Sequence, residues 1–325
     1  MTKKSPDAAA IASKLKHEGI VALYHFTSIE NLPGIADAQA LCSKQDLEDM
    51  GKWPPPQPGG NDVSLDLDRK ANNWDKVSFN FTTCTPMAYG VRQEKHLCFF
   101  VVSILVAERE GVTFTNTNAA AGNQDRAVGI DGLNLVNFDA IRSDPRPGDK
   151  DGWHRPVQAE VLVPGRISLT DVTEVVFVSQ ASMEEGVRLW GGRPHPSFRV
   201  EERFFANYPR AARPNINFPF LQRVVLTDDI VGKENASALR NHKTRFSRRQ
   251  SDRITAVLSL KALTGTEGVA RWDPPGIVAK EQFETFGGYN WWPHIPMSKL
   301  PDGPCTIEIW LSDVRWSKIE FRVTE

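Results

Sequence analysis

Two short stretches of the chain carry side chains that could do chemistry together. The first, residues 23–33, reads Leu-Tyr-His-Phe-Thr-Ser-Ile-Glu-Asn-Leu-Pro and places His25 and Thr27 at the end of an apolar strand. The second, residues 156–163, carries Glu160 among apolar residues. A carboxylate in so apolar a strand must be paired, solvated by a cleft or in use, because burying it bare is too costly. On these residues alone, a solvated edge-strand glutamate and a structural histidine are the simpler interpretations.

The hydrophobic pattern indicates the elements that position these residues. Apolar residues at every second position from 157 to 163 predict a half-buried strand with Glu160 on its opposite face. Thr27 and the glutamate three residues after it form a capping-box pattern, which predicts a turn into a helix. Because Pro33 cannot lie far inside a helix, the regular helix is expected to begin near Asn31, after one irregular turn.

The rest of the first two thirds of the chain reads as short strands with few helices between them. Residues 76–82 alternate apolar and polar side chains, and residues 97–106 form the continuous apolar run of a buried strand. Thr85 and Pro86 mark a helix start with proline at its first position. No βαβ rhythm is present, so the pattern favours an α+β domain with mainly antiparallel sheets.

The absent motifs and one unusual loop narrow the chemistry. The sequence has no G-x-G-x-x-G, no G-x-x-x-x-G-K-[ST] and no G-x-S-x-G, so it predicts no Rossmann crevice, P-loop or hydrolase elbow. Residues 53–60 are rich in proline and predict a stiff loop without regular structure. Long loops in compact domains are often binding loops or lids.

Composition sets bounds on the kind of protein. The 325 residues are 40% hydrophobic, enough for one large domain or two, and a net charge of −1 restricts any nucleic-acid surface to a local patch. The four cysteines are scattered without zinc-ligand spacing, which predicts no metal site and fits a reducing cytoplasm. The apolar run at residues 8–12 is too short for a signal peptide or a membrane span.

Five motifs occur in a fixed order between about residues 21 and 214. They are residues 23–35, an aromatic strand and Pro-Met-x-Tyr helix start (77–81 and 85–89), a Phe-Thr loop (114–118), the Gln-Ala-Glu strand (158–164) and a closing segment (211–214). As an ordered set they resemble the DarT-type ADP-ribosyltransferase toxins, which modify bases of single-stranded DNA using NAD. The resemblance implies a split sandwich of two mainly antiparallel sheets with NAD in the cleft between them. It leaves the last third of the chain untouched.

The resemblance implies that Glu160 and Arg69 are the catalytic residues. Glu160 would stabilise the positive charge that develops on the ribose as nicotinamide leaves, and it would take a proton from the attacking base. Arg69 has two interpretations, a solvated charge beside Asp66 and Asp68 or a guanidinium fork on the NAD diphosphate. The side chains expected to bind the cofactor NAD are Tyr24, His25, Thr27 and Asn31.

The acceptor is expected to meet residues on three further segments. Met87, Tyr89 and Asn118 would line its pocket, although core packing explains Met87 and Tyr89 equally well. Residues 240–253 concentrate lysine and arginine, including Arg248 and Arg249, in a chain that is otherwise nearly neutral. Such a segment is either a phosphate-binding surface or a solvated face whose cations pair with acids of its own domain.

The leading prediction is an NAD-dependent ADP-ribosyltransferase that modifies a base of single-stranded nucleic acid, with DNA favoured over RNA. A single-stranded acceptor is favoured because the base must leave any stack to reach Glu160. The family implies a cytoplasmic bacterial toxin or phage-defence effector, with a macrodomain antitoxin as partner. The alternatives are a transferase of RNA or protein and a non-catalytic nucleic-acid-binding module. Residues 1–213 are expected to form the transferase domain and residues 214–325 an accessory region of unknown role that is a candidate for binding nucleic acid.

Overall fold

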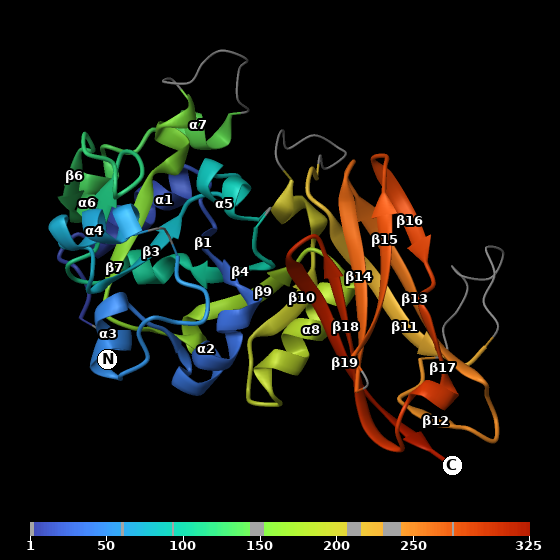
Figure 1. Cartoon of the computed structure of the whole chain (residues 1–325). Coiled ribbons are helices and arrows are strands. Elements are labelled where there is room, and N and C mark those ends of the chain that lie inside the picture. The colour runs from blue at the N-terminus through green and yellow to red at the C-terminus, as the bar shows by residue number, and fades with distance from the viewer. Residues whose placement is uncertain are drawn as a thin grey trace. The chain divides into compact units, whose positions relative to one another are not determined.

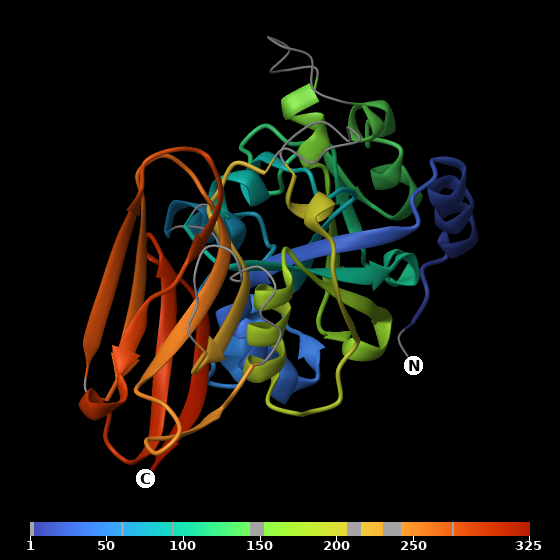
Figure 2. The same cartoon turned by 90° about the vertical axis from the view of Figure 1, so that its right-hand side faces the viewer.

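The structure is a computed structural model that describes residues 3–59, 62–92, 94–143, 153–206, 216–229, 242–274 and 276–325. The chain divides into two units, whose elements are labelled in Figure 1 and seen from the side in Figure 2. The first unit comprises Met1–Val91, Leu97–Phe177 and Arg188–Ile216. The second comprises Arg92–His96, Val178–Val187 and Asn217–Glu325.

An eight-stranded sheet lies at the centre of the first unit, in the order β10-β9-β4-β1-β3-β7-β5-β6 (Figure 1). Neighbouring strands in this sheet run antiparallel except β9 and β10, which run parallel. The short strands β2 and β8 form a separate pair. The bounds are β1 Ala22–Ser28, β2 Ala40–Leu41, β3 Lys76–Asn80, β4 Leu97–Ser103, β5 Thr113–Thr115, β6 Arg126–Val128, β7 Glu160–Pro164, β8 Ile167–Ser168, β9 Val172–Phe177 and β10 Ser197–Val200.

The sheet narrows between β1 and β3. Strand β1 pairs with β4 along all seven of its residues, from Ala22 to Ser28. Its pairing with β3 is a single residue pair, Tyr24 with Asn80. The buried strand expected at 97–106 is present in β4, which lies between two other strands, but it ends at Ser103. Residues Ile104–Glu108 form a 3-10 turn in which Leu105 is exposed. The prediction of an α+β fold with mainly antiparallel strands is confirmed.

In the chain, the helices of the first unit come before and between the strands of this sheet. The apolar residues Ile11 and Leu15 of α1 are buried, as an amphipathic helix requires. Of α8, the residues up to Val187 belong to the second unit. The bounds are α1 Ala8–His17, α2 Leu32–Ala38, α3 Lys44–Asp49, α4 Asp62–Lys70, α5 Pro86–Val91, α6 Gly129–Leu133, α7 Phe138–Arg142 and α8 Gln180–Trp190, with 3-10 turns at Ile29–Asn31, Ile104–Glu108, Pro156–Gln158, Leu169–Asp171 and Glu202–Phe205.

The turn after β1 is capped one residue later than expected. A 3-10 turn covers Ile29–Asn31 before α2 begins, which confirms the irregular turn that Pro33 requires. The capping side chain is Ser28, whose Oγ accepts a hydrogen bond from the Glu30 backbone N–H. The predicted cap at Thr27 is wrong, because Thr27 still lies in β1 and its Oγ1 accepts a hydrogen bond from Asn31.

The second unit is built from two further sheets (yellow to red in Figure 1). One has the order β11-β13-β16, with β17 also paired to β13, and the other has the order β12-β19-β18-β14-β15. Trp316 of β19 and Phe220 of β11 bring the two sheets into contact, with ring centroids 6.4 Å apart. The bounds are β11 Phe220–Thr227, β12 Arg245–Ser247, β13 Arg253–Ala262, β14 Thr266–Asp273, β15 Ile277–Phe283, β16 Gly287–Trp291, β17 His294–Pro296, β18 Gly303–Leu311 and β19 Val314–Thr324, with a 3-10 turn at Met297–Lys299.

Helices in the described ranges of the chain are short relative to a lipid bilayer. None of them is long and apolar enough to cross a membrane. The same described residues contain no group of three or more His, Cys, Asp or Glu side chains arranged to hold a metal ion.

Candidate active site

Glu160 opens strand β7 in the interior of the eight-stranded sheet. Strands β3 and β5 lie on either side of β7, and Glu160 is only 7% exposed. The interpretation as a solvated edge-strand glutamate is therefore wrong. The strand also starts later than residue 156, because Pro156–Gln158 form a 3-10 turn in which the Ala159 N–H bonds to the Pro156 carbonyl. Alternation along the sequence cannot distinguish such a turn from the first residues of a strand.

Hydrogen bonds hold the Glu160 carboxylate from two sides. Ser78 Oγ donates to Oε2 at 2.8 Å, and Asn118 Nδ2 donates to Oε1 at 3.3 Å. The backbone N–H of Glu160 donates to Thr115 Oγ1 at 3.0 Å, which fixes the start of the strand. Burial raises the pKa of Glu160 to about 7, against the opposing effects of the Ser78 hydrogen bond and a backbone hydrogen bond from Ala119. The carboxyl group is therefore poised to exchange a proton near neutral pH.

His25 shares a partner with Glu160, although their strands are not neighbours. Its Nδ1 lies 3.0 Å from the carbonyl oxygen of Ser78, and its ring packs edge-on against Phe79 and Phe100. Burial lowers the pKa of His25, so the ring is neutral at pH 7. Because a carbonyl only accepts, the proton lies on Nδ1 and leaves Nε2 as an acceptor. Ser78 of β3 thus joins the two candidate residues.

Asn31 fastens the proline-rich loop to the end of β1. Its Nδ2 donates to the Gln57 carbonyl at 2.7 Å, and its Oδ1 accepts from the Gln57 N–H at 2.9 Å. The same Nδ2 lies 2.9 Å from Thr27 Oγ1. Asn31 is buried, and these partners engage both its amide groups. The structure therefore brings Thr27 and Asn31 together and connects both to the loop at residues 53–59.

Arg69 lies in the last turn of α4 and is held by an aromatic ring and a carboxylate. Its guanidinium carbon is 3.6 Å from the centroid of the Trp74 ring, and its Nη2 is 2.6 Å from Glu48 Oε1. Trp74 Nε1 donates to the other Glu48 oxygen at 2.8 Å. Trp53, from the proline-rich loop, meets Trp74 edge-on at 5.1 Å. Glu48 and Trp74 therefore orient Arg69, whose side chain is still 51% exposed.

An ion pair next to this cluster acts on the electrostatics of Glu160. Lys44 Nζ of α3 lies 3.0 Å from Asp68 Oδ2 of α4. The negative charge of Asp68 raises the pKa of Glu160, and the positive charge of Lys44 lowers it. Lys44 also lowers the pKa of His25. The charges of Lys44 and Asp68 thus shift the pKa of Glu160, and the charge of Lys44 also shifts the pKa of His25.

Tyr24, Met87 and Tyr89 are less closely connected with Glu160. Tyr24 is adjacent to His25 in a strand, so its side chain points to the other face of the sheet, where it meets Phe204 edge-on at 5.7 Å. Met87 of α5 is 38% exposed, and Tyr89 of the same helix is half-buried. No contact with Glu160 is described for these three residues, and their predicted roles in binding remain predictions.

The basic segment lies in the second unit, and some of its cations are engaged by acids or carbonyl groups of that unit. The guanidinium of Arg248 bonds to Asp302 at 3.1 Å and to the carbonyl oxygens of Met297 and Leu300. Lys243 pairs with Asp228, whereas Arg249 is exposed. Arg248 therefore has a structural role in this unit. Arg240 and the motif at 211–214 lie outside the described residues.

Residues Ser78 and Asn73 were missed as functional candidates. Ser78 was expected only as an outward-facing residue of the strand at 76–82, although that placement puts it on the same polar face as Glu160. Asn73 is buried, accepts a hydrogen bond from Arg126 at 3.2 Å and donates to the Ala119 carbonyl at 3.3 Å. Nothing in the local sequence marks these contacts of Asn73, because Ala119 and Arg126 lie 46 and 53 residues away.

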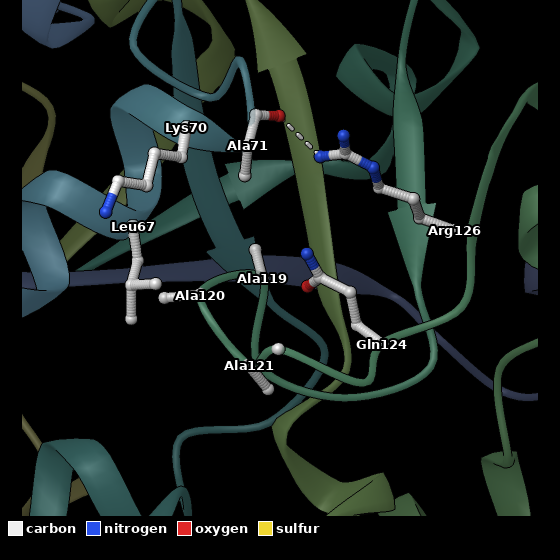
Figure 3. Close-up of a pocket in the computed structure, with 9 residues that line it drawn as sticks. Leu67, Lys70, Ala71, Ala119, Ala120, Ala121, Gln124 and Arg126 are labelled. Carbon is white, nitrogen blue, oxygen red and sulfur yellow. Dashed lines mark hydrogen bonds between the residues drawn. The ribbon is translucent and has the colours of Figure 1, made fainter.

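A pocket of about 330 Å³ adjoins this network (Figure 3). One wall is the end of α4 and the residue that follows it, and the other is the loop between β5 and β6 with Arg126 at its end. Arg126 Nη1 reaches across to the Ala71 carbonyl at 2.6 Å (Figure 3). The lining residues are Leu67, Lys70, Ala71, Ala119, Ala120, Ala121, Gly122, Gln124 and Arg126.

Comparison with solved structures gives weak similarities to DarT proteins. The chain shares 20% identity with Thermus sp. 2.9 DarT in complex with NAD⁺, covering 57% of this chain and 97% of that one at a TM-score of 0.44. With Thermus sp. 2.9 DarT in complex with ADP-ribosylated ssDNA the identity is 17%, covering 63% of this chain and 99% of that one at a TM-score of 0.46. With Thermosipho africanus DarTG in complex with ADP-ribose the identity is 20%, covering 57% of this chain and 51% of that one at a TM-score of 0.45.

The family assignment rests on a different comparison, because these TM-scores are all below 0.5. No curated protein matches the chain. A family model described as "ssDNA thymidine ADP-ribosyltransferase, DarT" matches residues 24–203, which is more than half of the 325 residues. This range includes Glu160, His25 and Arg69. The chain therefore belongs to the DarT family of ssDNA thymidine ADP-ribosyltransferases.

Proposed function

We propose that Glu160 transfers ADP-ribose from NAD to a thymine base in single-stranded DNA. As a member of the DarT family, the protein is an NAD-dependent ADP-ribosyltransferase of single-stranded DNA. The observation that carries the residue assignment is the buried Glu160 carboxyl, held by Ser78 and Asn118, with a pKa of about 7.

The reaction needs both protonation states of one carboxyl group. The bond between the ribose C1′ and the nicotinamide nitrogen breaks, and nicotinamide leaves with the electron pair. The ionised Glu160 stabilises the positive charge on the ribose. A ring nitrogen of the base then bonds to C1′, and its proton passes to Glu160. A pKa near the working pH suits a group that must first be charged and then accept a proton.

The remaining residues have proposed roles in binding. His25 and Thr27 hold the nicotinamide riboside, Arg69 holds the diphosphate, and Asn31 keeps the loop at 53–59 in place over them. We also propose that the sheet is a split sandwich whose halves separate between β1 and β3, and the single residue pair between these strands supports this. We further propose that the enzyme is a toxin or phage-defence effector in the cytoplasm, and that a macrodomain protein reverses its mark.

The test is the mass of oligonucleotides after incubation with NAD. The wild-type protein should add one ADP-ribose to a single-stranded DNA containing one thymine and leave a thymine-free DNA, a duplex and an RNA of the same sequence unchanged. Glu160→Gln should keep NAD binding and lose roughly 10²–10⁴ in rate. Transfer within tenfold of wild type by Glu160→Gln, or transfer to RNA or protein instead of DNA, would refute the proposal.

A further inference from the structure

Two contacts fix the orientation of the Arg69 guanidinium in different ways. The group lies over the Trp74 ring, with its carbon 3.6 Å from the ring centroid, which sets where the guanidinium sits. Glu48 sets its rotation, because Nη2 lies 2.6 Å from Glu48 Oε1. Arginine suits this arrangement, since its planar cation both stacks on an aromatic face and donates hydrogen bonds in a fixed fork.

The rest of the guanidinium is open to a ligand. The N–H groups on Nε and Nη1 of Arg69 make no hydrogen bond to any of the residues that the structure describes. The side chain is also exposed. A phosphate that meets two such N–H groups forms a pair of charge-assisted hydrogen bonds. Arg69 therefore keeps a free edge for an anion while its other contacts hold it in place.

Helix α3 holds Trp74 at two points. The Gln45 N–H donates to the Trp74 carbonyl at 2.9 Å, and one turn further along the helix Glu48 Oε2 accepts from Trp74 Nε1 at 2.8 Å. Residues three apart lie on the same face of a helix, so both bonds come from one side of α3. The hydrogen bonds from Trp74 and Arg69 lower the pKa of Glu48, which keeps its carboxylate charged at neutral pH.

The Trp74 ring has further neighbours that restrict it. Trp53, from the proline-rich loop, meets it edge-on with ring centroids 5.1 Å apart. The Lys44 amine lies 5.6 Å from the ring centroid and is paired with Asp68. Trp74 is buried among these groups. The ring is therefore a fixed platform for the exposed cation that stacks on it.

We propose that Trp74 and Glu48 are positioning residues of the donor site, which present the free edge of Arg69 to the NAD diphosphate. Neither residue needs to touch NAD, because both act through Arg69. A guanidinium that is already oriented loses less conformational freedom when the diphosphate binds. The inference rests on the proposed function, in which Arg69 holds the diphosphate. The alternative is that the cluster only packs α3 against the end of α4.

A double-mutant cycle with Arg69→Ala separates these two roles. The measurement is the Kd of NAD for the full chain, by calorimetry without DNA. Arg69→Ala should weaken binding about tenfold or more, because it removes hydrogen bonds to a charged group. Trp74→Leu should weaken binding about fivefold, and Trp74→Phe less, because a ring remains beneath the guanidinium. Added to Arg69→Ala, Trp74→Leu should have no further effect.

Glu48→Ala is the second variant, and it decides the test if Trp74→Leu folds poorly. The Glu48 side chain is 31% exposed, so its loss leaves no cavity in the core. Glu48→Ala should weaken NAD binding in the wild-type background and not in the Arg69→Ala background. The control is Asp49→Ala, which removes an equal charge from an exposed position of the same helix, where Asp49 bonds to Gln45. This control should bind NAD as the wild type does.

Three results would overturn the inference. The first is wild-type NAD affinity in Trp74→Leu and Glu48→Ala, and the second is an equal loss of affinity with and without Arg69. The third is tighter NAD binding by Glu48→Ala, which would make Glu48 a competitor of the diphosphate. If Arg69→Ala binds NAD as well as the wild type does, the role of Arg69 fails and the inference fails with it. If the wild type binds no NAD, the proposed function itself fails.

Discussion

Ser78 makes hydrogen bonds to both Glu160 and His25 and so orients both side chains. Its hydroxyl donates to the Glu160 carboxylate, and its carbonyl accepts from the His25 ring. The hydroxyl bond favours the charged carboxylate and opposes the effect of burial on its pKa. The carbonyl bond selects the His25 tautomer with a free Nε2.

Removing the Ser78 hydroxyl should move the pH dependence of transfer. Ser78→Ala takes away a bond to the ionised form, so the pKa of Glu160 should rise above about 7. Because the ionised form is the active one in the proposed mechanism, the acid limb of log kcat/KM should shift to higher pH by about one unit. The measurement is the pH–rate profile of transfer between pH 5 and 9. Ser197→Ala, at an exposed position of β10, is the control, and an unshifted limb in Ser78→Ala would contradict this view of Glu160.

The same pKa predicts a conflict between activity and stability at Glu160. Its pKa is raised on folding from 4.5 to about 7, so the folded protein binds the proton more tightly than the unfolded chain. The resulting stabilisation is complete below pH 4.5 and is lost as the pH rises through 7. It amounts to roughly 3 kcal/mol over this range. Glu160→Gln, which stays neutral, should therefore gain stability relative to wild type between pH 5 and pH 8 in denaturant melts, and an equal response of both proteins would contradict the raised pKa.

At the scale of elements, the local sequence predicted several strands and helices of the first unit. The buried run from Leu97 gave β4, and the constraint at Pro33 gave the irregular turn before α2. The errors occurred where two local patterns are alike: residues 156–158 alternate like a strand but form a 3-10 turn after Arg155. Hydrogen bonds between distant segments, not local preference, decide such ambiguous positions.

The candidate site also has a part that the local sequence predicts and a part that depends on contacts between distant segments. Glu160 and His25 could be found from their strands and from the motif order, because each stands out within its own segment. The residues that hold the site side chains in place could not be found from the local sequence. Arg69 meets Glu48 from 21 positions earlier, and Ser78 meets Glu160 from 82 positions earlier. Such contacts depend on strand order and helix placement, which local patterns do not encode.

The loop at residues 53–59 is an element whose position depends on one side chain. Asn31→Ala removes both hydrogen bonds to Gln57 and the one to Thr27. We expect KM for NAD to rise about tenfold while kcat changes little, because the loop is proposed to lie over the donor and Glu160 is untouched. Steady-state kinetics with NAD as the varied substrate would measure this. Gln45→Ala, which removes an exposed bond to Asp49 within one helix, is the control, and a loss confined to kcat would show that Asn31 acts elsewhere.

At the scale of the whole molecule, the basic segment should act through its exposed arginines. Arg245 of β12 is paired in register with Arg322 of β19, and both are exposed. Like charges directly opposite each other are unfavourable, unless an anion binds between them. Arg245→Ala with Arg249→Ala should therefore weaken binding of single-stranded DNA and flatten its salt dependence by about 0.7 in the slope of log K against log salt for each lost phosphate contact. Fluorescence anisotropy at several salt concentrations measures this slope, with Arg248→Ala expected to lower stability and leave the slope unchanged.

The second unit takes part of its core from residues far ahead of it in the chain, which bears on the expected division at residues 213 and 214. His96 contacts Ser182 Oγ through Nε2 at 2.6 Å and the Arg315 carbonyl through Nδ1 at 3.2 Å, and its ring lies 4.1 Å from that of Trp316. Glu185 accepts a hydrogen bond from the Lys318 N–H. These partners of His96 and Glu185 in β19 would be missing from a chain that ends at residue 216.

A chain truncated after residue 216 should therefore fail to fold as an independent transferase. It would expose His96, Ser182 and Glu185, all of which are buried in the second unit. We expect low soluble yield and no cooperative melt for residues 1–216, with recovery when residues 217–325 are supplied on a second chain. The complete protein also offers a readout of this contact, since burial lowers the pKa of His96 to about 3. An unfolded histidine titrates near 6.5, so this contact loses stability as the pH falls from 6.5 towards 3, and His96→Gln should lose less over that range. A truncated chain that melts cooperatively and transfers ADP-ribose would show instead that the segments 92–96 and 178–187 can be satisfied within the transferase itself.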